Sequence, residues 1–491
     1  MRRRLLVATA GLAVSVLACD AHAQTAAPPD KEDKRVEALS HEVEELKALV
    51  HHLQDQILRV LPAEGGVPEG EVQALKDEIR DLRDQLAAAR QTPPEPAAPQ
   101  TAEAPEETGK QPKVVADVLR GLTINAMFDG YYEYNFDIPI GRVNSLRAYD
   151  VSSNSFSINQ ADLMIESAPD PGNGKRYGMR VDFQYGQATS STQGNLANEL
   201  RPDVYRNLYQ AYGTYVFPLG DGLTVDFGKW ASSLGYEGNY TKDQINYSRS
   251  YWFNYLPFYH TGLRAKYAVN DELALNLWIT NGTQQTETFN NFKDQMYGLV
   301  YTPTPALSWT FNYYRGQEHP DVVYLQNPTP AQQAALPNLQ GTYIQPITAP
   351  ADGLLNILDS YATWQVSPEL LLGAEADYVE QKLYSYSPAL HVYGGAAYAS
   401  YQFSPKFAVS ARAEYLADHG GLFSGAAQDL KEGTLTFDYR VADGFLLRSE
   451  FRRDWSNRPY FLTHDLGVLT RDQPTVGLGL VWWLGQKEGA W

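Results

Sequence analysis

The chain has 491 residues, a formal net charge of −18 and a large share of tyrosine, with 33 Tyr against 18 Phe and 9 Trp. Tyrosine favours strands and membrane–water interfaces, because one end of its ring is apolar and the other is polar. The negative charge argues against a nucleic-acid partner, because phosphate binding requires a basic surface.

Residues 1–23 have the pattern of a secretory signal peptide. Three arginines at 2–4 precede an apolar run at 5–18 and a small-x-small cleavage site at 21–23. This run is too short for a transmembrane helix. A second interpretation makes Cys19 a lipidated cysteine, but Asp20 after it resembles an inner-membrane retention signal. Cleavage after residue 23 would remove the single cysteine of the chain, and with it any disulfide or thiol chemistry.

Residues 36–60 follow a heptad pattern, with apolar side chains spaced alternately three and four apart. A shorter run of the same kind spans 72–89. The apolar side chains form a narrow stripe along the predicted helix, which favours self-association through an α-helical coiled coil over packing on a core. We therefore expect an arm over residues 24–90. The proline-rich stretch at 91–120 is then a semi-extended linker.

From about residue 121 the apolar spacing changes to two, the period of a β-strand. In residues 177–185, for example, Tyr177 and Met179 face one side, and Arg180 and Asp182 the other. About sixteen such segments are expected, near 121–134, 154–167, 176–186, 206–217, 222–230, 258–268, 272–280, 292–302, 307–315, 353–366, 369–380, 389–403, 405–416, 431–440, 444–454 and 474–484.

The connections between these segments alternate between short and long. Short ones, such as 218–221 and 269–271, take turns with long ones, such as 187–205, 231–257 and 316–352. Short periplasmic turns and long external loops produce this alternation in outer-membrane barrels. We therefore expect residues 121–491 to form an all-β transmembrane antiparallel barrel with both ends in the periplasm, and the arm to lie in the periplasm as well. A closed barrel is the remaining membrane option for an exported chain without a spanning helix.

Eight short segments of the barrel region carry a family resemblance. They are Asn154–Ala161, Arg180–Phe183, Tyr209–Tyr212, Val225–Lys229, Gly235–Glu237, Asn246–Ser250, Pro257–Arg264 and Trp482–Gly485. In this order they resemble the OmpL-like β-barrel porins. The resemblance covers most of the barrel and none of the arm. It implies a barrel, a pore and an outer-membrane location, but no particular substrate.

Charged residues on the polar faces of the strands indicate a wet interior, because a charge facing lipid costs a few kcal/mol near the midplane. A barrel of about sixteen strands is wide enough for an aqueous channel. The alternative is a wall closed by ion pairs. Both signs are similarly frequent, so no anion or cation preference follows. The expected pore-lining residues are Arg180, Asp182, Asp226, Arg264, Lys266, Glu375, Asp377, Arg412, Glu414, Asp438, Arg440, Arg448, Glu450 and Arg452.

The connection at 231–257 carries seven aromatic side chains together with Lys242, Asp243 and Arg249. Exposed aromatic surface is unfavourable, so these rings must pack on something. One interpretation folds the connection inward as a constriction loop, where Arg249 would act on permeating ions. The other places the rings in an outer aromatic girdle on longer strands.

The function expected from these features is passive diffusion of small hydrophilic solutes or ions. No zinc-ligand spacing, phosphate loop or catalytic motif is found, so we expect no cofactor, no metal and no enzymatic activity, although some outer-membrane barrels are hydrolases. The alternative is a structural tether from the outer membrane to the cell wall through the arm. The heptad residues favour two strands, but porins are often trimers, so a homotrimer in outer-membrane lipid is expected.

Overall fold

The computed structural model of the chain describes residues 121–194, 198–325, 343–487 and 489–491. The predicted signal peptide (1–23), arm (24–90) and linker (91–120) lie outside the described residues, and they remain predictions. Within the described ranges, no helix has the length and apolar character needed to cross a membrane.

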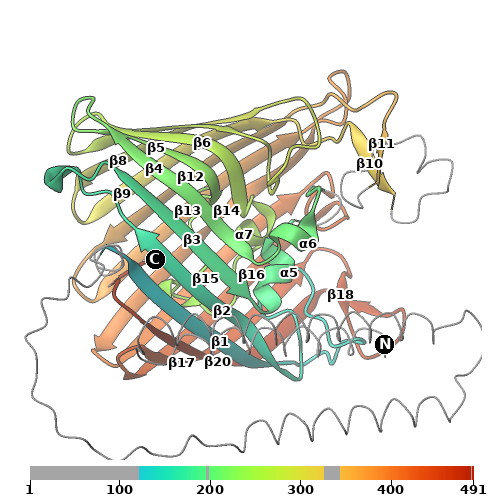
Figure 1. Cartoon of the computed structure of the whole chain (residues 1–491). Helices are drawn as coiled ribbons and strands as arrows, with labels where there is room; N and C mark the ends of the chain where they lie inside the picture. The colour runs from blue at the N-terminus through green and yellow to red at the C-terminus, as the bar shows by residue number, and fades with distance from the viewer. Residues whose placement is uncertain (1–120, 195–197, 326–342, 488) are drawn as a thin grey trace, which may run out of the picture. The chain divides into compact units, whose positions relative to one another are not determined.

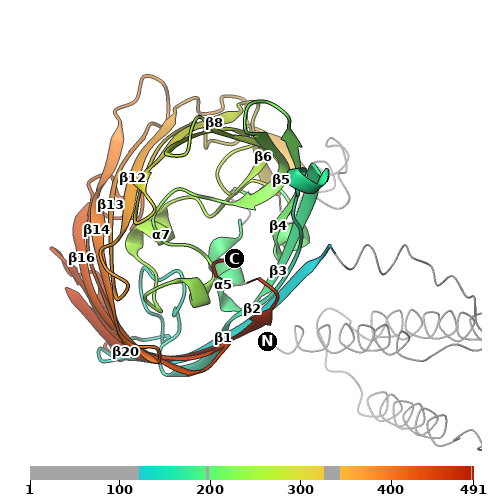
Figure 2. The same cartoon turned by 90° about the vertical axis from the view of Figure 1, so that its left-hand side faces the viewer.

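Sixteen antiparallel strands form a closed barrel, shown from the side in Figure 1 and along its interior in Figure 2. Neighbours around the barrel follow the order of the chain, and the first strand pairs with the last. The strands are β1 (Thr123–Asn135), β2 (Ser155–Ser167), β3 (Tyr177–Tyr185), β4 (Leu208–Phe217), β5 (Leu223–Ala231), β6 (Tyr259–Ala268), β7 (Leu273–Thr280), β8 (Asp294–Thr304), β9 (Leu307–Gly316), β12 (Leu355–Gln365), β13 (Leu370–Gln381), β14 (Leu390–Ser404), β15 (Phe407–Asp418), β16 (Gln428–Ala442), β17 (Phe445–Ser456) and β20 (Asp472–Gly485).

The predicted barrel is confirmed, and each expected strand segment overlaps an observed strand. The sequence did not indicate the small elements inside the connections, because they are too short to show a period. These are the strand pairs β10 (Val322–Leu325) with β11 (Tyr343–Pro346) and β18 (Phe461–Leu462) with β19 (Leu469–Thr470), the helices α5 (Gln187–Thr192), α6 (Pro202–Tyr205) and α7 (Tyr251–Tyr255), and the 3-10 helices η2 (Pro171–Asn173) and η3 (Thr241–Asp243).

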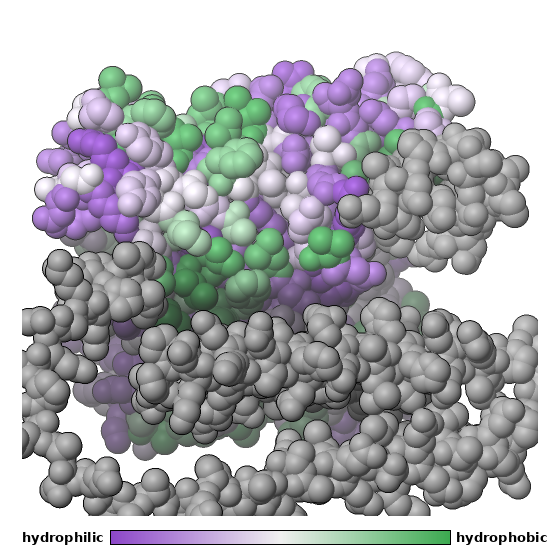
Figure 3. Space-filling model, viewed as in Figure 1, coloured by the Kyte–Doolittle hydropathy of each residue, from purple (hydrophilic) through white to green (hydrophobic). Residues whose placement is uncertain are grey.

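The barrel wall is apolar outside and polar inside. On β3, Tyr177 and Tyr185 are 67% and 56% exposed on the outer face, whereas Arg180, Asp182 and Gln184 on the inner face are at most 6% exposed. In Figure 3, the uncovered part of the visible face shows hydrophobic patches between hydrophilic residues. This arrangement matches an outer face in lipid and charged residues inside.

The connection from β5 to β6 lies inside the barrel. Figure 2 shows it crossing the interior of the ring, with α7 as its best-formed element. We call residues 232–258 the inward loop. Tyr251 and Trp252 of this loop are fully buried and belong to the largest cluster of buried apolar residues. The aromatic side chains of the loop therefore pack in the interior and not in an outer girdle.

Candidate functional site: the interior of the barrel

Two glutamates of the wall hold the backbone of the inward loop. Glu450 of β17 accepts hydrogen bonds from the N–H groups of residues 247 and 248, at 2.6 and 2.9 Å. Glu414 of β15 accepts the N–H groups of residues 251 and 252, both at 2.8 Å. Each carboxylate takes two consecutive N–H groups, and hydrogen bonds to an ionised acceptor are stronger than neutral ones. The hydrogen bonds to Glu414 satisfy the first two N–H groups of α7, which have no partner within the helix.

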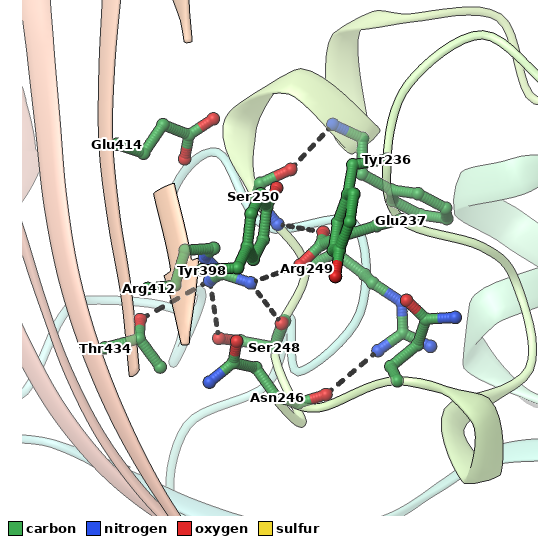
Figure 4. Close-up of polar contacts among 12 residues, drawn as sticks. Tyr236, Glu237, Asn246, Ser248, Arg249, Ser250, Tyr398, Arg412, Glu414 and Thr434 are labelled. Carbon is green, nitrogen blue, oxygen red and sulfur yellow. Dashed lines mark hydrogen bonds and ion pairs between the residues drawn. The ribbon is translucent and has the colours of Figure 1, made fainter. Parts of the chain in front are cut away.

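Arg412 of the wall binds a carbonyl group and the one glutamate of the inward loop (Figure 4). Arg412 of β15 donates to Ser248 O at 2.8 Å and to Glu237 Oε1 at 2.6 Å. Its Nε donates to Glu432 Oε1 of β16, also at 2.6 Å. The Arg412 side chain is 0% exposed. Breaking such a buried pair is costly, because it leaves a buried charge without a partner.

Two further arginines complete this attachment. Arg448 of β17 donates to Thr241 O at 3.1 Å and to Gln244 O at 2.6 Å. Arg452 of the same strand donates to Arg249 O at 2.5 Å. We call β12–β17 the docked wall, because its interior charges bind the loop. The charges expected to line open water on these strands are instead largely covered by residues 232–258.

Arg249 differs from the expectation that it acts on ions in a constriction. Its side chain lies within the loop and is 1% exposed. Its Nε donates to Gly238 O at 3.0 Å, and its Nη groups donate to Tyr247 O at 2.8 Å and Asn239 O at 2.9 Å. The guanidinium also lies 4.5 Å from the centre of the Tyr149 ring. Arg249 thus ties the loop to itself, so reversing its charge would disrupt the loop before it changed ion selectivity.

Lys242 and Asp243, also expected at a constriction, form an ion pair with each other at 2.6 Å. Lys242 Nζ lies 4.5 Å from the centre of the Trp491 ring, and Asp243 Oδ2 accepts the backbone N–H of Trp491 at 3.0 Å. Burial lowers the pKa of Lys242, and Asp243 opposes this shift. These two charges therefore neutralise each other next to the last residues of the chain.

The loop phenols bind wall carboxylates. Tyr251 donates to Asp454 Oδ1 at 2.7 Å, and Tyr247 donates to Asp129 Oδ1 at 2.8 Å. Burial raises the pKa of both tyrosines well above the ordinary value. Both phenols therefore remain protonated donors across the physiological pH range.

On the opposite side, the strands β3–β6 face a cavity of about 440 Å³. We call these strands the cavity wall. Arg180, Tyr212 and Arg264 of this wall line the cavity together with Tyr236 and Phe253 of the inward loop. The space left inside the ring thus has a polar strand face on one side and the loop on the other.

The charges of the cavity wall form pairs within the wall. Arg180 donates to Asp182 at 2.7 and 3.0 Å, and Arg264 Nε donates to Asp226 at 2.6 Å. The Arg264 guanidinium lies 4.9 Å from the centre of the Tyr212 ring, and its side chain is 25% exposed. Within the described part of the chain, Nε makes the only hydrogen bond of Arg264, so both Nη groups are available to water or a solute.

The remaining expected pore residues have three different surroundings. Lys266 and Arg440 lie on the inner side of β6 and β16 and are exposed, whereas Asp438 pairs with Arg448 at 2.7 Å. Glu375 and Asp377 are buried on the inner face of β13. Together with Asp359 of β12 they are the described carboxylates whose oxygens lie close enough to share a metal ion.

Several residues of the interior were missed from the sequence. Asp359 and Glu432 lie on inward positions of predicted strands. Because side chains alternate between the two faces of a strand, the sequence pattern could have identified both as interior residues. Glu237 stands in the 231–257 connection beside the aromatic residues, and no local pattern connects it to Arg412. Tyr212 is one of many tyrosines, and only the fold places it under Arg264.

A family model described as "Putative beta-barrel porin-2, OmpL-like" matches residues 121–483. The chain belongs to this porin family. The match covers the barrel, and it confirms the resemblance seen in the eight sequence segments. This porin is therefore a β-barrel of the outer-membrane type.

No curated protein matches this porin. Solved structures with a similar fold include the outer membrane protein OmpT of Vibrio cholerae, at 11% identity and a TM-score of 0.44, with 74% of this chain and 97% of that chain covered. An anion-selective porin from Comamonas acidovorans has 8% identity, a TM-score of 0.45 and coverages of 74% and 99%. The outer membrane channel DcaP of Acinetobacter baumannii has 12% identity and a TM-score of 0.45, with 74% of this chain and 97% of that chain covered. Sequence identities and TM-scores this low do not indicate which solute this porin transports.

Proposed function

We propose that this porin lets small hydrophilic solutes diffuse passively between the cavity wall and the inward loop, and that it is a channel with no enzymatic activity. The observation that carries the proposal is the polar cavity beside Arg264, whose Nη groups make no hydrogen bond within the described residues. Rows of charged and aromatic groups at a narrow passage can discriminate among solutes. The docked wall contributes little to the path, because the loop covers it.

Planar-bilayer recording of the purified protein tests this proposal. We expect stepwise ion conductance. Ser232 lines the cavity, and Ser232→Cys should become sensitive to a charged thiol reagent that reduces the conductance. The matched control is Ser449→Cys on the outer side of β17, where Ser449 pairs with the exposed Phe437 and Leu478. A protein that inserts but does not conduct, or equal block of both variants, would contradict the proposed path.

We further propose that the protein is a homotrimer with its arm in the periplasm. Membership of a porin family supports the trimer. The topology supports the periplasmic arm, because β1 begins and β20 ends at the end of the barrel that carries the short turns. Cross-linking of the detergent-solubilised protein should give a trimer mass. A tag in the arm should resist protease in intact cells and become accessible when the outer membrane is opened.

The tether to the cell wall is not favoured as a function. It depends on the heptads of residues 24–90, which lie outside the described residues, and the family match covers only the barrel. Deletion of residues 24–112 should therefore leave both the conductance of one barrel and the integrity of the envelope unchanged, whereas a tether predicts unchanged conductance with a weakened envelope.

A further inference from the structure

Three carboxylates meet on the inner face of the docked wall. Glu375 and Asp377 are two residues apart on β13, so their side chains point to the same face. Asp359 of β12 stands directly opposite Asp377 in the antiparallel pair. One oxygen of each residue lies within 4.8 Å of the others, and no member is more than 5% exposed.

No positive side chain of the described ranges forms an ion pair with this group. Among the ion pairs of the described residues, none includes Asp359, Glu375 or Asp377, whereas nearby Arg412 is bound by Glu237 and Glu432. Burying a charge is costly unless it is paired. Three like charges at this separation raise that cost further, because their mutual repulsion is poorly screened away from water.

The hydrogen bonds of the group single out Asp377. Asp359 accepts the Gly235 N–H at 3.1 Å, and Glu375 accepts the Tyr236 N–H and the Tyr398 hydroxyl, both at 2.9 Å. In the part of the chain that the structure describes, neither oxygen of Asp377 has a hydrogen-bond partner, although the residue is only 5% exposed. A buried acceptor of this kind needs an explanation, such as a bound ion. Asp377 is directed at two further carboxylates, and a cation held by all three would supply the partner that its oxygens lack.

We propose that Asp359, Glu375 and Asp377 bind a calcium ion. The donors are all oxygens, which suit hard cations, and the group contains no His or Cys to favour zinc. Calcium–oxygen distances of about 2.3–2.6 Å place ligands on opposite sides of the ion about 5 Å apart. Oxygens within 4.8 Å of one another are therefore close enough to share one calcium after small side-chain movements. Magnesium demands shorter, near-octahedral geometry and gives up its waters reluctantly.

The bound ion would stabilise the start of the inward loop. Gly235 and Tyr236 donate their N–H groups to two of the three ligands, so a fixed ligand geometry also fixes this part of the backbone. Gly235 has φ = +89°, and a Cβ there would lie 3.1 Å from Glu375 Oε1, which explains why glycine suits the close approach. Calcium would thus connect β12, β13 and the loop at one point.

Terbium luminescence of the full-length protein in detergent, after removal of metals with a chelator, tests the site. The Tyr398 ring lies beside Glu375 and should sensitise bound Tb³⁺. We expect one saturable Tb³⁺ site per barrel that Ca²⁺ displaces at a lower concentration than Mg²⁺. Loss of a second-shell partner typically weakens metal binding about 10–100-fold, so Asp377→Asn, which removes a ligand, should weaken it at least about tenfold.

Asp226→Asn is the matched control, because Asp226 is an interior carboxylate that already pairs with Arg264. It should leave Tb³⁺ affinity unchanged. As a second measurement, Ca²⁺ should raise the unfolding temperature of the unaltered protein but not of Asp377→Asn. Absence of saturable, Ca²⁺-displaceable binding, as expected if the carboxyl groups only share protons, would overturn the proposal. So would equal loss of affinity in the two variants, or full binding by Asp377→Asn.

Discussion

Arg412 on the docked wall and Arg264 on the cavity wall both pair with carboxylates, yet their surroundings differ. The Arg412 side chain is 0% exposed and binds two glutamates and a loop carbonyl, whereas Arg264 is 25% exposed and, among the described residues, donates only through Nε. Arg412 therefore stabilises the inward loop, whereas Arg264 has Nη groups that are available to water or a solute. The comparison teaches that a charge on an inward strand position does not by itself mark the path of a solute.

The largest expected effect comes from Arg412→Ala. This change leaves Glu237 buried without its cation and leaves Glu432 with only the longer pair to Arg452 at 3.5 Å, and breaking a buried pair typically costs about 3–5 kcal/mol. The inward loop should detach from the docked wall. Single-channel recordings should then show a larger and noisier conductance, and the free energy of unfolding should fall. Arg453→Ala on β17 is the control, because its pair with Asp472 is 45% exposed on the arginine side, and such pairs contribute about 0–1 kcal/mol. Equal changes in both variants would contradict the docked-wall assignment.

A smaller effect is expected for Glu450→Gln. The amide keeps the size of the side chain but replaces one acceptor oxygen, so one of the N–H groups of residues 247 and 248 loses its partner. An unsatisfied buried donor costs about 1–3 kcal/mol. Limited proteolysis should cut the inward loop faster than in the unaltered protein, while the barrel still forms. Unchanged cleavage within the loop would argue that Glu450 does not hold it.

Arg264→Gln should change selectivity with little change in the loop. The variant leaves Asp226 without its cation beside the cavity, so the reversal potential in a KCl gradient should shift towards cations. The shift should be larger at 0.01 M than at 1 M salt, because the screening length falls from about 30 to about 3 Å. The double variant Arg264→Gln with Asp226→Asn removes both charges and should return the potential towards its original value. A potential that stays shifted in the double variant would contradict the electrostatic cause.

The smallest effect is expected for Lys266→Gln. Lys266 is exposed on the inner side of β6 and has no ion pair among the described residues. Its charge should be screened within about 10 Å at 0.1 M salt. The reversal potential should therefore move less than in Arg264→Gln. A larger shift would place the narrow part of the path near Lys266 and away from Arg264.

The barrel could be predicted from the sequence because its signals are local. In residues 177–185 the alternation of Tyr177, Met179 and Val181 with Arg180 and Asp182 needs no knowledge of other strands. The alternation of short and long connections is equally visible along the chain. Boundaries were less accurate, as at β16, which begins at Gln428 and not near 431. Its first residues bind neighbouring strands, since Gln428 accepts a hydrogen bond from Ser456 of β17 and Asp429 accepts one from Tyr415 of β15. The local period does not show these partners.

The sequence by itself thus determined which segments become strands and which of their residues point inward. Only the tertiary structure decided which inward charges meet the loop and which meet the cavity. Glu450 and Tyr247 are 203 positions apart, and Arg412 and Ser248 are 164 apart. Whether the aromatic connection folds inward likewise depends on these distant partners. Closing the barrel brings strand β17 and the loop after β5 into contact, and no period within either segment encodes that contact.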